Sequence, residues 1–234
     1  MSSHAGLAAY PSVRHEYGRL VERGEISRDP AQEVIVARLD RLIVDIGATN
    51  AAAKTSALGW MFARKKTPAA PQGLYLHGGV GRGKTMLMDM FFRLAPLKRK
   101  RRSHFNEFMA DVHDRIGAHR AAVKAGTAKG DDPIPPVAAA IAAESRLLCF
   151  DEFTVTDIAD AMILSRLFTA LFANGVTLVA TSNVAPDDLY RDGLNRALFL
   201  PFVATLKEHV EIVPLDTQTD YRMLKLSHLP IYIQ

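Results

Sequence analysis

Cysteine is almost absent from this sequence, and no long apolar run occurs in it. Of 234 residues only Cys149 is a cysteine, which excludes an internal disulfide and a metal site built on several cysteines. No apolar stretch approaches the roughly 20 residues that a membrane-spanning helix needs. The first residues have neither a basic start nor a sustained apolar core, and Glu16 comes early, so neither a secretory signal nor a transit peptide is indicated. We therefore expect a cytoplasmic protein.

The composition is typical of a folded, soluble protein. Hydrophobic residues make up 48% of the chain and charged residues 23%, and the length suits one α/β domain with a short additional segment. Much of the net charge of +4 comes from one run of cations, residues 98–102. That run can be a solvated loop after a helix, or a contact for nucleic acid or an acidic membrane surface. No aromatic residue is interleaved within it, which weakens the case for binding single strands.

Residues 1–70 are predicted to form an N-terminal helical segment and a linker. Asp29 and Pro30 are a plausible helix start, because proline suits the first helical position. Apolar residues then recur at helical spacing: Val34, Ile35, Leu39, Leu42, Ile43 and Ile46. Two prolines and a glycine within residues 67–73, TPAAPQG, indicate a boundary before the next part of the chain.

After this boundary, apolar strands alternate with helices, a pattern typical of a parallel sheet covered by helices. Strands are expected at 74–77, 103–105, 147–150, 176–180 and 210–213. Helices are expected at 84–94, 107–123, 158–173 and 202–208, with a loop at 125–136. Cys149 lies inside the apolar run 147–150, where we expect its side chain to be buried.

Residues 78–85, GGVGRGKT, match the phosphate-binding pattern G-x-x-x-x-G-K-[ST]. Glycines let the backbone curl so that successive N–H groups point at phosphate oxygens, and the following helix adds its positive end. We expect Lys84 to reach the β- and γ-phosphates of ATP, and Thr85 to offer its hydroxyl to Mg²⁺. The residues predicted to bind the nucleotide are Gly78, Gly79, Val80, Gly81, Arg82, Gly83, Lys84, Thr85 and Met86.

Two acids, Asp151 and Glu152, follow the apolar strand at 147–150. The carboxyl ends of parallel strands are where open α/β folds bind their ligands. Asp151 suits the Mg²⁺ side of the site, and Glu152 suits the base that positions the attacking water. A kinase must keep water away from the γ-phosphate, so the adjacent acid pair favours hydrolysis.

Two polar side chains further along are also candidates for catalysis. Asn183 follows the strand at 176–180 and can hydrogen-bond the attacking water or the γ-phosphate. Alternatively, Ser182 or Asn183 caps the short segment that begins near Pro186. Arg196 can act as an arginine finger that completes a neighbouring subunit's site, or it is a surface arginine. Arg191 competes with it for the finger role.

Four stretches of the chain together resemble the AFG-one-like, or ZapE-type, branch of the AAA+ ATPases. They are GLYLHGGVGRGKTMLMDMFF at 73–92, HFNEFMADVH at 104–113, LLCFDEFTVTDIADAMILSRLF at 147–168, and TLVATSNVAPDDLYRDGLNRALFLPFV at 177–203. They span most of residues 73–221, and residues 11–45 resemble the family's N-terminal helical segment. The combination is far more specific than the phosphate-binding pattern alone.

The resemblance implies an AAA+ core at residues 71–221, a three-layer fold with a five-stranded parallel sheet in the order 5-1-4-3-2. It implies an ATPase whose nucleotide and Mg²⁺ contacts are Lys84 and Thr85. Asp151 and Glu152 match the acids of hydrolysis, Asn183 the sensor and Arg196 the finger. Family members usually continue into a helical lid, whereas this chain stops at Gln234, so we expect residues 222–234 to be a short tail in its place.

The resemblance also implies ring-like oligomers and protein partners. Bacterial members are linked to cell division and the FtsZ ring, and mitochondrial relatives to the handling of inner-membrane proteins. In AAA+ rings the region after the second strand often lines the central pore, where Phe105 or Phe108 would grip a polypeptide. However, Phe105, Phe108, Met109, Val112 and Ile116 also share one helical face, which is the pattern of a core.

The leading hypothesis for function is an ATP-driven remodelling factor that acts on protein partners and requires self-association. The alternatives are a small-molecule kinase, an ATP-dependent nucleic-acid loader that uses the cations at 98–102, and a nucleotide-gated scaffold with little turnover. They differ in their predicted phosphoryl acceptor, in the salt dependence of binding and in the hydrolysis rate.

Overall fold

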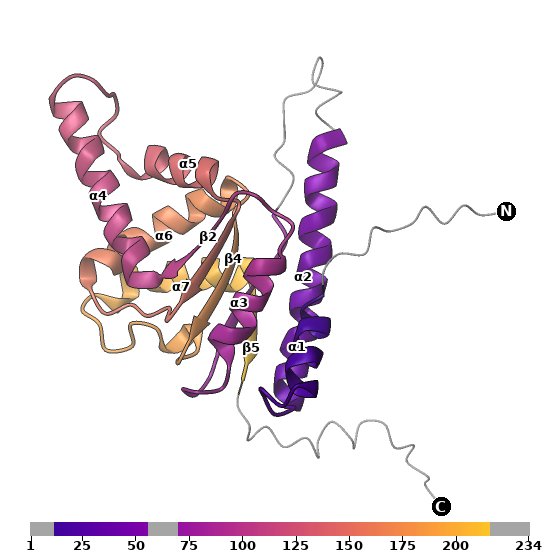
Figure 1. Ribbon diagram of the computed structural model, residues 1–234. Helices are drawn as coiled ribbons and strands as arrows, with labels where there is room; N and C mark the ends of the chain where they lie inside the picture. Colours follow the sequence, from indigo (N-terminus) through magenta and orange to yellow (C-terminus); the bar gives the residue numbers. More distant parts are fainter. Residues whose placement is uncertain (1–11, 56–69, 216–234) are drawn as a thin grey trace, which may run out of the picture.

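The computed structural model describes residues 12–55 and 70–215, and it is built around a five-stranded parallel sheet (Figure 1). The strand order is β2-β3-β4-β1-β5, which confirms the predicted order 5-1-4-3-2. All four strand pairings are parallel. The strands are β1 (Gly73–His77), β2 (Lys100–His104), β3 (Leu147–Asp151), β4 (Thr177–Ser182) and β5 (Val210–Pro214).

Helices cover both faces of the sheet, because the central strands are apolar on both sides and must be buried on both. One face is covered by α4 (Phe105–Lys124), α5 (Ile134–Glu144), α6 (Ile158–Ala173) and α7 (Leu200–His209). Their core with the sheet is rich in phenylalanine. Two single-turn segments, η2 (Pro186–Asp188) and η3 (Arg196–Leu198), lie between β4 and α7.

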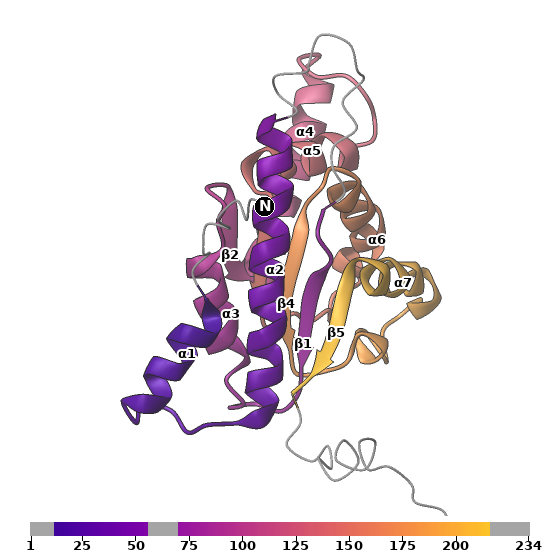
Figure 2. The same cartoon turned by 90° about the vertical axis from the view of Figure 1, so that its right-hand side faces the viewer.

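The other face is covered by α3 (Lys84–Leu94), over which α1 (Val13–Glu22) and α2 (Pro30–Thr55) pack (Figure 2). Helix α2 begins at Pro30, as predicted, and Ile35, Leu39 and Ile43 are fully buried in this second core. Asp40 of α2 accepts hydrogen bonds from Ser12 Oγ and from the backbone N–H of Val13, which anchors the start of α1. The N-terminal helices are therefore part of the layer that supports α3, the helix after the predicted phosphate-binding loop.

Only Lys98 and Arg99 lie in the loop that the sequence suggested for residues 98–102, because β2 begins at Lys100 and ends at His104. The prediction of a strand at 103–105 was therefore misplaced, and Phe105 is the first residue of α4. Strand β2 lies at the edge of the sheet and pairs only with β3. Charged side chains are common on edge strands, because they prevent pairing with a further strand. Lys100 donates to the carbonyls of Phe92 and Arg93 at the end of α3 and to that of Ala95, the residue after the helix.

The pore interpretation of Phe105 and Phe108 is wrong for this chain. Both side chains are completely buried, and their rings pack against Phe150 and other phenylalanines of the core. Cys149 is buried as predicted, and burial raises the pKa of its thiol. The tail at 222–234 and the end of the predicted linker lie outside the described residues.

Candidate active site

The predicted phosphate-binding loop connects β1 to α3 and lies at the carboxyl edge of the sheet. The backbone conformation of the loop favours glycine at position 83. Gly83, the residue before α3, has a φ of 83°, and a Cβ on it would lie 2.8 Å from Nε2 of Gln32. The same amide nitrogen of Gln32 donates to the carbonyl of Arg82 at 2.9 Å, so α2 contacts the loop directly.

Lys84, at the start of α3, is buried, and its ammonium group is held inside the loop. Its Nζ donates to the carbonyls of Gly78 at 2.7 Å and Gly79 at 2.8 Å, and to Oδ1 of Asn183 at 3.2 Å. The predicted sensor asparagine, 99 residues further along the chain, thus contacts the predicted phosphate-binding lysine. Neighbouring parallel strands β1 and β4 bring the two together.

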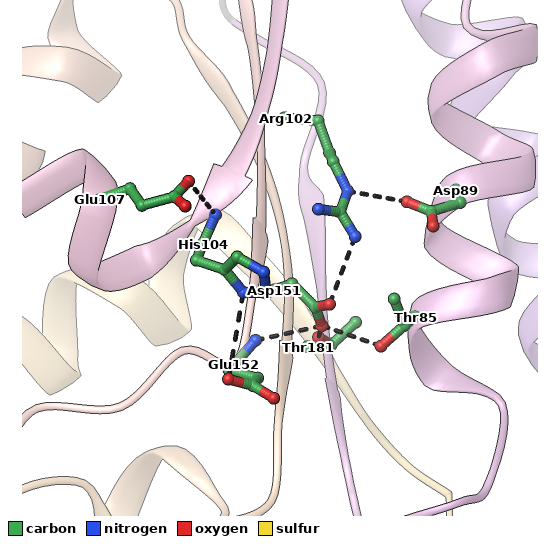
Figure 3. Close-up of polar contacts among 8 residues, drawn as sticks. All are labelled: Thr85, Asp89, Arg102, His104, Glu107, Asp151, Glu152 and Thr181. Carbon is green, nitrogen blue, oxygen red and sulfur yellow. Dashed lines mark hydrogen bonds and ion pairs between the residues drawn. The ribbon is translucent and has the colours of Figure 1, made fainter.

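Asp151 ends β3 and is the most highly connected acid of this edge (Figure 3). Its Oδ1 accepts hydrogen bonds from Thr85 Oγ1 at 2.9 Å and from Thr181 Oγ1 at 2.6 Å. Its Oδ2 accepts one from Arg102 Nη2 at 3.3 Å. Burial by itself would raise the pKa of Asp151, but the hydrogen bonds from Thr181 and Thr85 and the charge of Arg102 lower it, so the side chain is ionised at neutral pH.

Glu152, the next residue, is oriented quite differently. Its φ of 53° lies in the left-handed region, which a non-glycine residue adopts only under local strain, often at functional sites. Its side chain is 76% exposed, and Oε2 lies 4.0 Å from Nδ1 of His104 at the end of β2. Its carboxylate points away from that of Asp151 and toward His104 (Figure 3), and Glu152 lines the cavity described next.

A cavity of about 430 Å³ lies between the loop and these strand ends. Its lining includes Lys84, Thr85, Asp151, Glu152 and Asn183, so the structure brings these predicted residues together. A second cavity, of about 650 Å³, lies beside the loop between the segment 26–32 and Gly81, Gly83 and Met86. Among the described residues, no cluster of three or more His, Cys, Asp or Glu side chains could hold a metal ion by itself.

Arg196 does not belong to this cavity of its own chain. It opens η3, and its Nη2 donates to the carbonyl of Asp187 at 2.5 Å. Its Nε is buried and has no hydrogen-bond partner among the described residues. Arg191, the competing candidate, forms an exposed ion pair with Asp188 at 3.2 Å.

Several residues of this edge were missed by the sequence predictions. Arg102 was treated only as one of a run of cations, and Thr181 was not considered. Asp89 had an available signal, since it lies four residues after Thr85 on a predicted helix and therefore on the same face. His104 had none, because its position beside Glu152 depends on the pairing of β2 with β3.

Comparisons with known proteins identify the family of this chain. A family profile described as AFG1-like ATPase matches residues 11–234. The chain belongs to the AFG1-like ATPase family. The resemblance inferred from the sequence is thereby confirmed.

Two curated relatives of this AFG1-like chain are similar over much of its length. Cell division protein ZapE of Escherichia coli K12 is 41% identical over 227 residues, which cover 93% of this chain and 58% of ZapE. Lactation elevated protein 1 homolog B of Danio rerio is 54% identical over 163 residues, which cover 68% of this chain and 32% of that protein. The AFG1-like chain thus spans between 32% and 58% of the length of these two relatives.

Among solved structures, that of DnaI superposes on this AFG1-like chain with a TM-score of 0.51 at 13% identity. The match covers 81% of this chain and 87% of DnaI, and it shows a shared AAA+ fold. No helix among residues 12–55 and 70–215 is both long enough and apolar enough to cross a membrane.

Proposed function

We propose that this chain binds ATP with Mg²⁺ and hydrolyses it. The observation that carries the proposal is the convergence of Lys84, Thr85, Asp151, Glu152 and Asn183 on one cavity of about 430 Å³ at the carboxyl edge of the sheet. These residues come from α3, β3 and the end of β4, and the match of their chemistry to a nucleoside triphosphate is difficult to explain by packing alone.

The loop and Lys84 would bind the phosphates. The contacts of the Lys84 ammonium with the carbonyls of Gly78 and Gly79 keep it pointing into the loop, from where it can exchange one of them for a phosphate oxygen. The second cavity, next to Gly83 and Met86, would receive the base and sugar, with Gln32 at its border.

The oxygen atoms of Thr85 and Asp151 fit a Mg²⁺ ion. They are hard ligands only 2.9 Å apart, and Mg²⁺ in nucleotide sites is typically held by one or two carboxylates together with phosphates and water. A bound Mg²⁺ would neutralise the charge that develops on the phosphates. With so few protein ligands, binding of the metal should depend strongly on the nucleotide.

Glu152 and Asn183 would act on the attacking water. The exposed Glu152 carboxylate can accept its proton, and the amide of Asn183 can orient it beside the γ-phosphate. A kinase would need a site that excludes water, whereas Glu152 is 76% exposed in this chain, so water is the favoured acceptor.

We further propose that the site is completed by a second copy of the chain, with Arg196 as the finger. Arg196 is held by a single carbonyl, and large apolar side chains around it, Leu194, Leu198 and Leu200, are at least 45% exposed. A role on a protein client in cell division is suggested by the name of the ZapE relative alone. A nucleic-acid loader is less well supported, since Lys100, Arg101 and Arg102 already have internal partners. The scaffold with little turnover remains the alternative.

The test is the ATPase rate per subunit as a function of protein concentration. We expect the rate to rise with concentration, and Lys84→Ala and Glu152→Gln to be inactive. An equimolar mixture of Arg196→Ala and Glu152→Gln should regain activity, since the intact site of one variant receives the finger of the other. A rate independent of concentration, with an inactive mixture, would contradict the shared site. Tight ATP binding without hydrolysis would favour the scaffold.

A further inference from the structure

Arg102 bridges two carboxylates that come from different layers of the fold (Figure 3). Its Nε donates to Oδ1 of Asp89 on α3 at 2.9 Å, and its Nη2 donates to Oδ2 of Asp151 at 3.3 Å. Asp89 lies one helical turn after Thr85, whose hydroxyl donates to the other oxygen of Asp151. Thr85, Asp151, Arg102 and Asp89 therefore form a closed circuit that starts and ends on the helix of the phosphate-binding loop.

The two oxygens of Asp151 are divided between different partners. Oδ1 accepts from Thr85, from Thr181 and from the backbone N–H of Glu152, whereas the contact of Oδ2 in this circuit is with Arg102. Arg102 therefore opposes rotation of the carboxylate about its Cβ–Cγ bond from the Oδ2 side. The side chain of Asp151 is only 8% exposed, so water has little access to replace that contact.

We propose that Arg102 is a positioning residue of the nucleotide site: anchored by Asp89, it fixes the carboxylate of Asp151 so that Oδ1 faces Thr85 and the metal. This role rests on the proposed function, because it acts through the residue that would bind Mg²⁺. Partners that hold a metal-binding carboxylate typically contribute 10–100-fold to metal affinity or activity.

Charge alone predicts the opposite effect, which makes the proposal testable. Removing a cation next to a metal-binding carboxylate should strengthen the attraction of that carboxylate for Mg²⁺. Weaker binding of the metal after loss of Arg102 would therefore report the loss of orientation and not the loss of charge.

The neighbouring Arg101 provides a matched control. Successive side chains of a strand point to opposite faces of the sheet. Arg101 therefore pairs with Asp111 of α4, at 2.5 Å, and not with Asp151. Both arginines are in β2, with side chains 27% and 28% exposed, and Arg101 forms one ion pair where Arg102 forms two. Replacing either one removes an arginine–aspartate ion pair from the same strand, but only Arg102 contacts Asp151.

The experiment measures the affinity for a fluorescent, non-hydrolysable ATP analogue with EDTA and with Mg²⁺. The variants are Arg102→Gln, Arg102→Lys, Asp89→Asn and Arg101→Gln, and the thermal midpoint of each is recorded. For Arg102→Gln we expect the Mg²⁺-dependent gain in affinity to fall about tenfold, with little change in the metal-free affinity. Arg102→Lys should lose less, because a lysine keeps the charge but cannot span both carboxylates. Asp89→Asn should also lose less, and Arg101→Gln should behave as wild type.

Three results would overturn the positioning role. One is a metal-dependent gain that is unchanged or larger in Arg102→Gln. Another is a parallel fall of the metal-free affinity, the metal-bound affinity and the thermal midpoint, which would make Arg102 a structural link only. The third is an equal loss in Arg101→Gln. If the wild-type chain itself bound no nucleotide, the proposed function would fail, and that result is distinct from all three.

Discussion

The carboxyl edge of the sheet and the aromatic layer under α4–α7 both depend on β3, but they are held by different forces. At the edge, Asp151 is fixed by hydrogen bonds and an ion pair whose geometry must be kept. One residue earlier, the ring of Phe150 lies in a layer of buried aromatic rings, which is stabilised mainly by the hydrophobic effect. The layer comprises Phe105, Phe108, Phe150, Phe153, Phe168, Phe172, Phe199 and Phe202. Activity and stability should therefore be separable within a few residues of one strand.

The largest separation is expected for Glu152→Gln. Loss of a general base typically lowers kcat by about 100- to 10,000-fold, which corresponds to roughly 3–5 kcal/mol of activation free energy. The free energy of unfolding should not change measurably, because the Glu152 side chain is 76% exposed. Steady-state ATPase assays and urea unfolding check the two quantities. Glu208→Gln, an exposed change of the same chemistry on α7, is the control and should alter neither.

Phe168→Ala should show the reverse pattern. The ring of Phe168 packs against those of Phe108, Phe150, Phe172 and Phe202, and it is 1% exposed. Truncation of such a side chain costs about 3–5 kcal/mol of unfolding free energy. Urea unfolding measures the loss, and Phe168→Leu should lose much less. Under conditions where the variant remains folded, we expect nucleotide affinity close to that of wild type. A large fall in that affinity would show that the two regions are not separable.

The sequence predicted the parts of both regions whose signals are local. Helices α3 and α6 have the bounds expected at 84–94 and 158–173, because glycine, proline and capping residues sit at their ends. Strand β2 was misplaced because its residues, Lys100–His104, carry no apolar pattern, and only its pairing with β3 makes it a strand. The pairing of Arg102 with Asp151 could not be predicted either, since it joins residues 49 positions apart through that same pairing.

Thr181 lies on the boundary between the two regions, so Thr181→Val should affect both. The residue is 1% exposed in β4, and its hydroxyl donates to the ionised Asp151 at 2.6 Å. Loss of a hydrogen bond to a charged group costs about 1.5–3 kcal/mol, and here the loss would also free Oδ1 of Asp151. We expect both the unfolding free energy and the ATPase rate to fall.

Thr177→Val is the matched control for this variant. Thr177 is also buried in β4, but its hydroxyl donates to the neutral carbonyl of Pro71 at 3.3 Å, at the other end of the strand. It should cost about 0.5–1.5 kcal/mol of unfolding free energy and leave the ATPase rate unchanged. Equal losses of stability in the two variants would contradict the charged character of the Thr181 contact.

The smallest effect is expected for Asp111→Asn. It tests whether polar contacts away from the carboxyl edge of the sheet contribute as much to stability as those at the edge. Burial would raise the pKa of Asp111, but hydrogen bonds from Arg115 and Arg101 lower it below its ordinary value of 3.8. A carboxylate with a lowered pKa stabilises the fold above its unfolded pKa, and this stabilisation disappears as the pH falls through the folded pKa. Because the pairs are partly exposed and screened, the contribution should be about 1 kcal/mol or less.

Urea unfolding at several pH values separates this charge effect from packing. The deficit of Asp111→Asn relative to wild type should be constant from neutral pH to about pH 5 and should shrink as the pH falls below about 4, where Asp111 of the unfolded wild type becomes protonated. A deficit that stays constant at low pH would instead come from altered packing of α4. A deficit as large as that of Thr181→Val would mean that the contacts of Asp111 with Arg101 and Arg115 stabilise the fold as much as those at the carboxyl edge of the sheet. Polar contacts at the edge would then differ from polar contacts elsewhere only in their effect on activity.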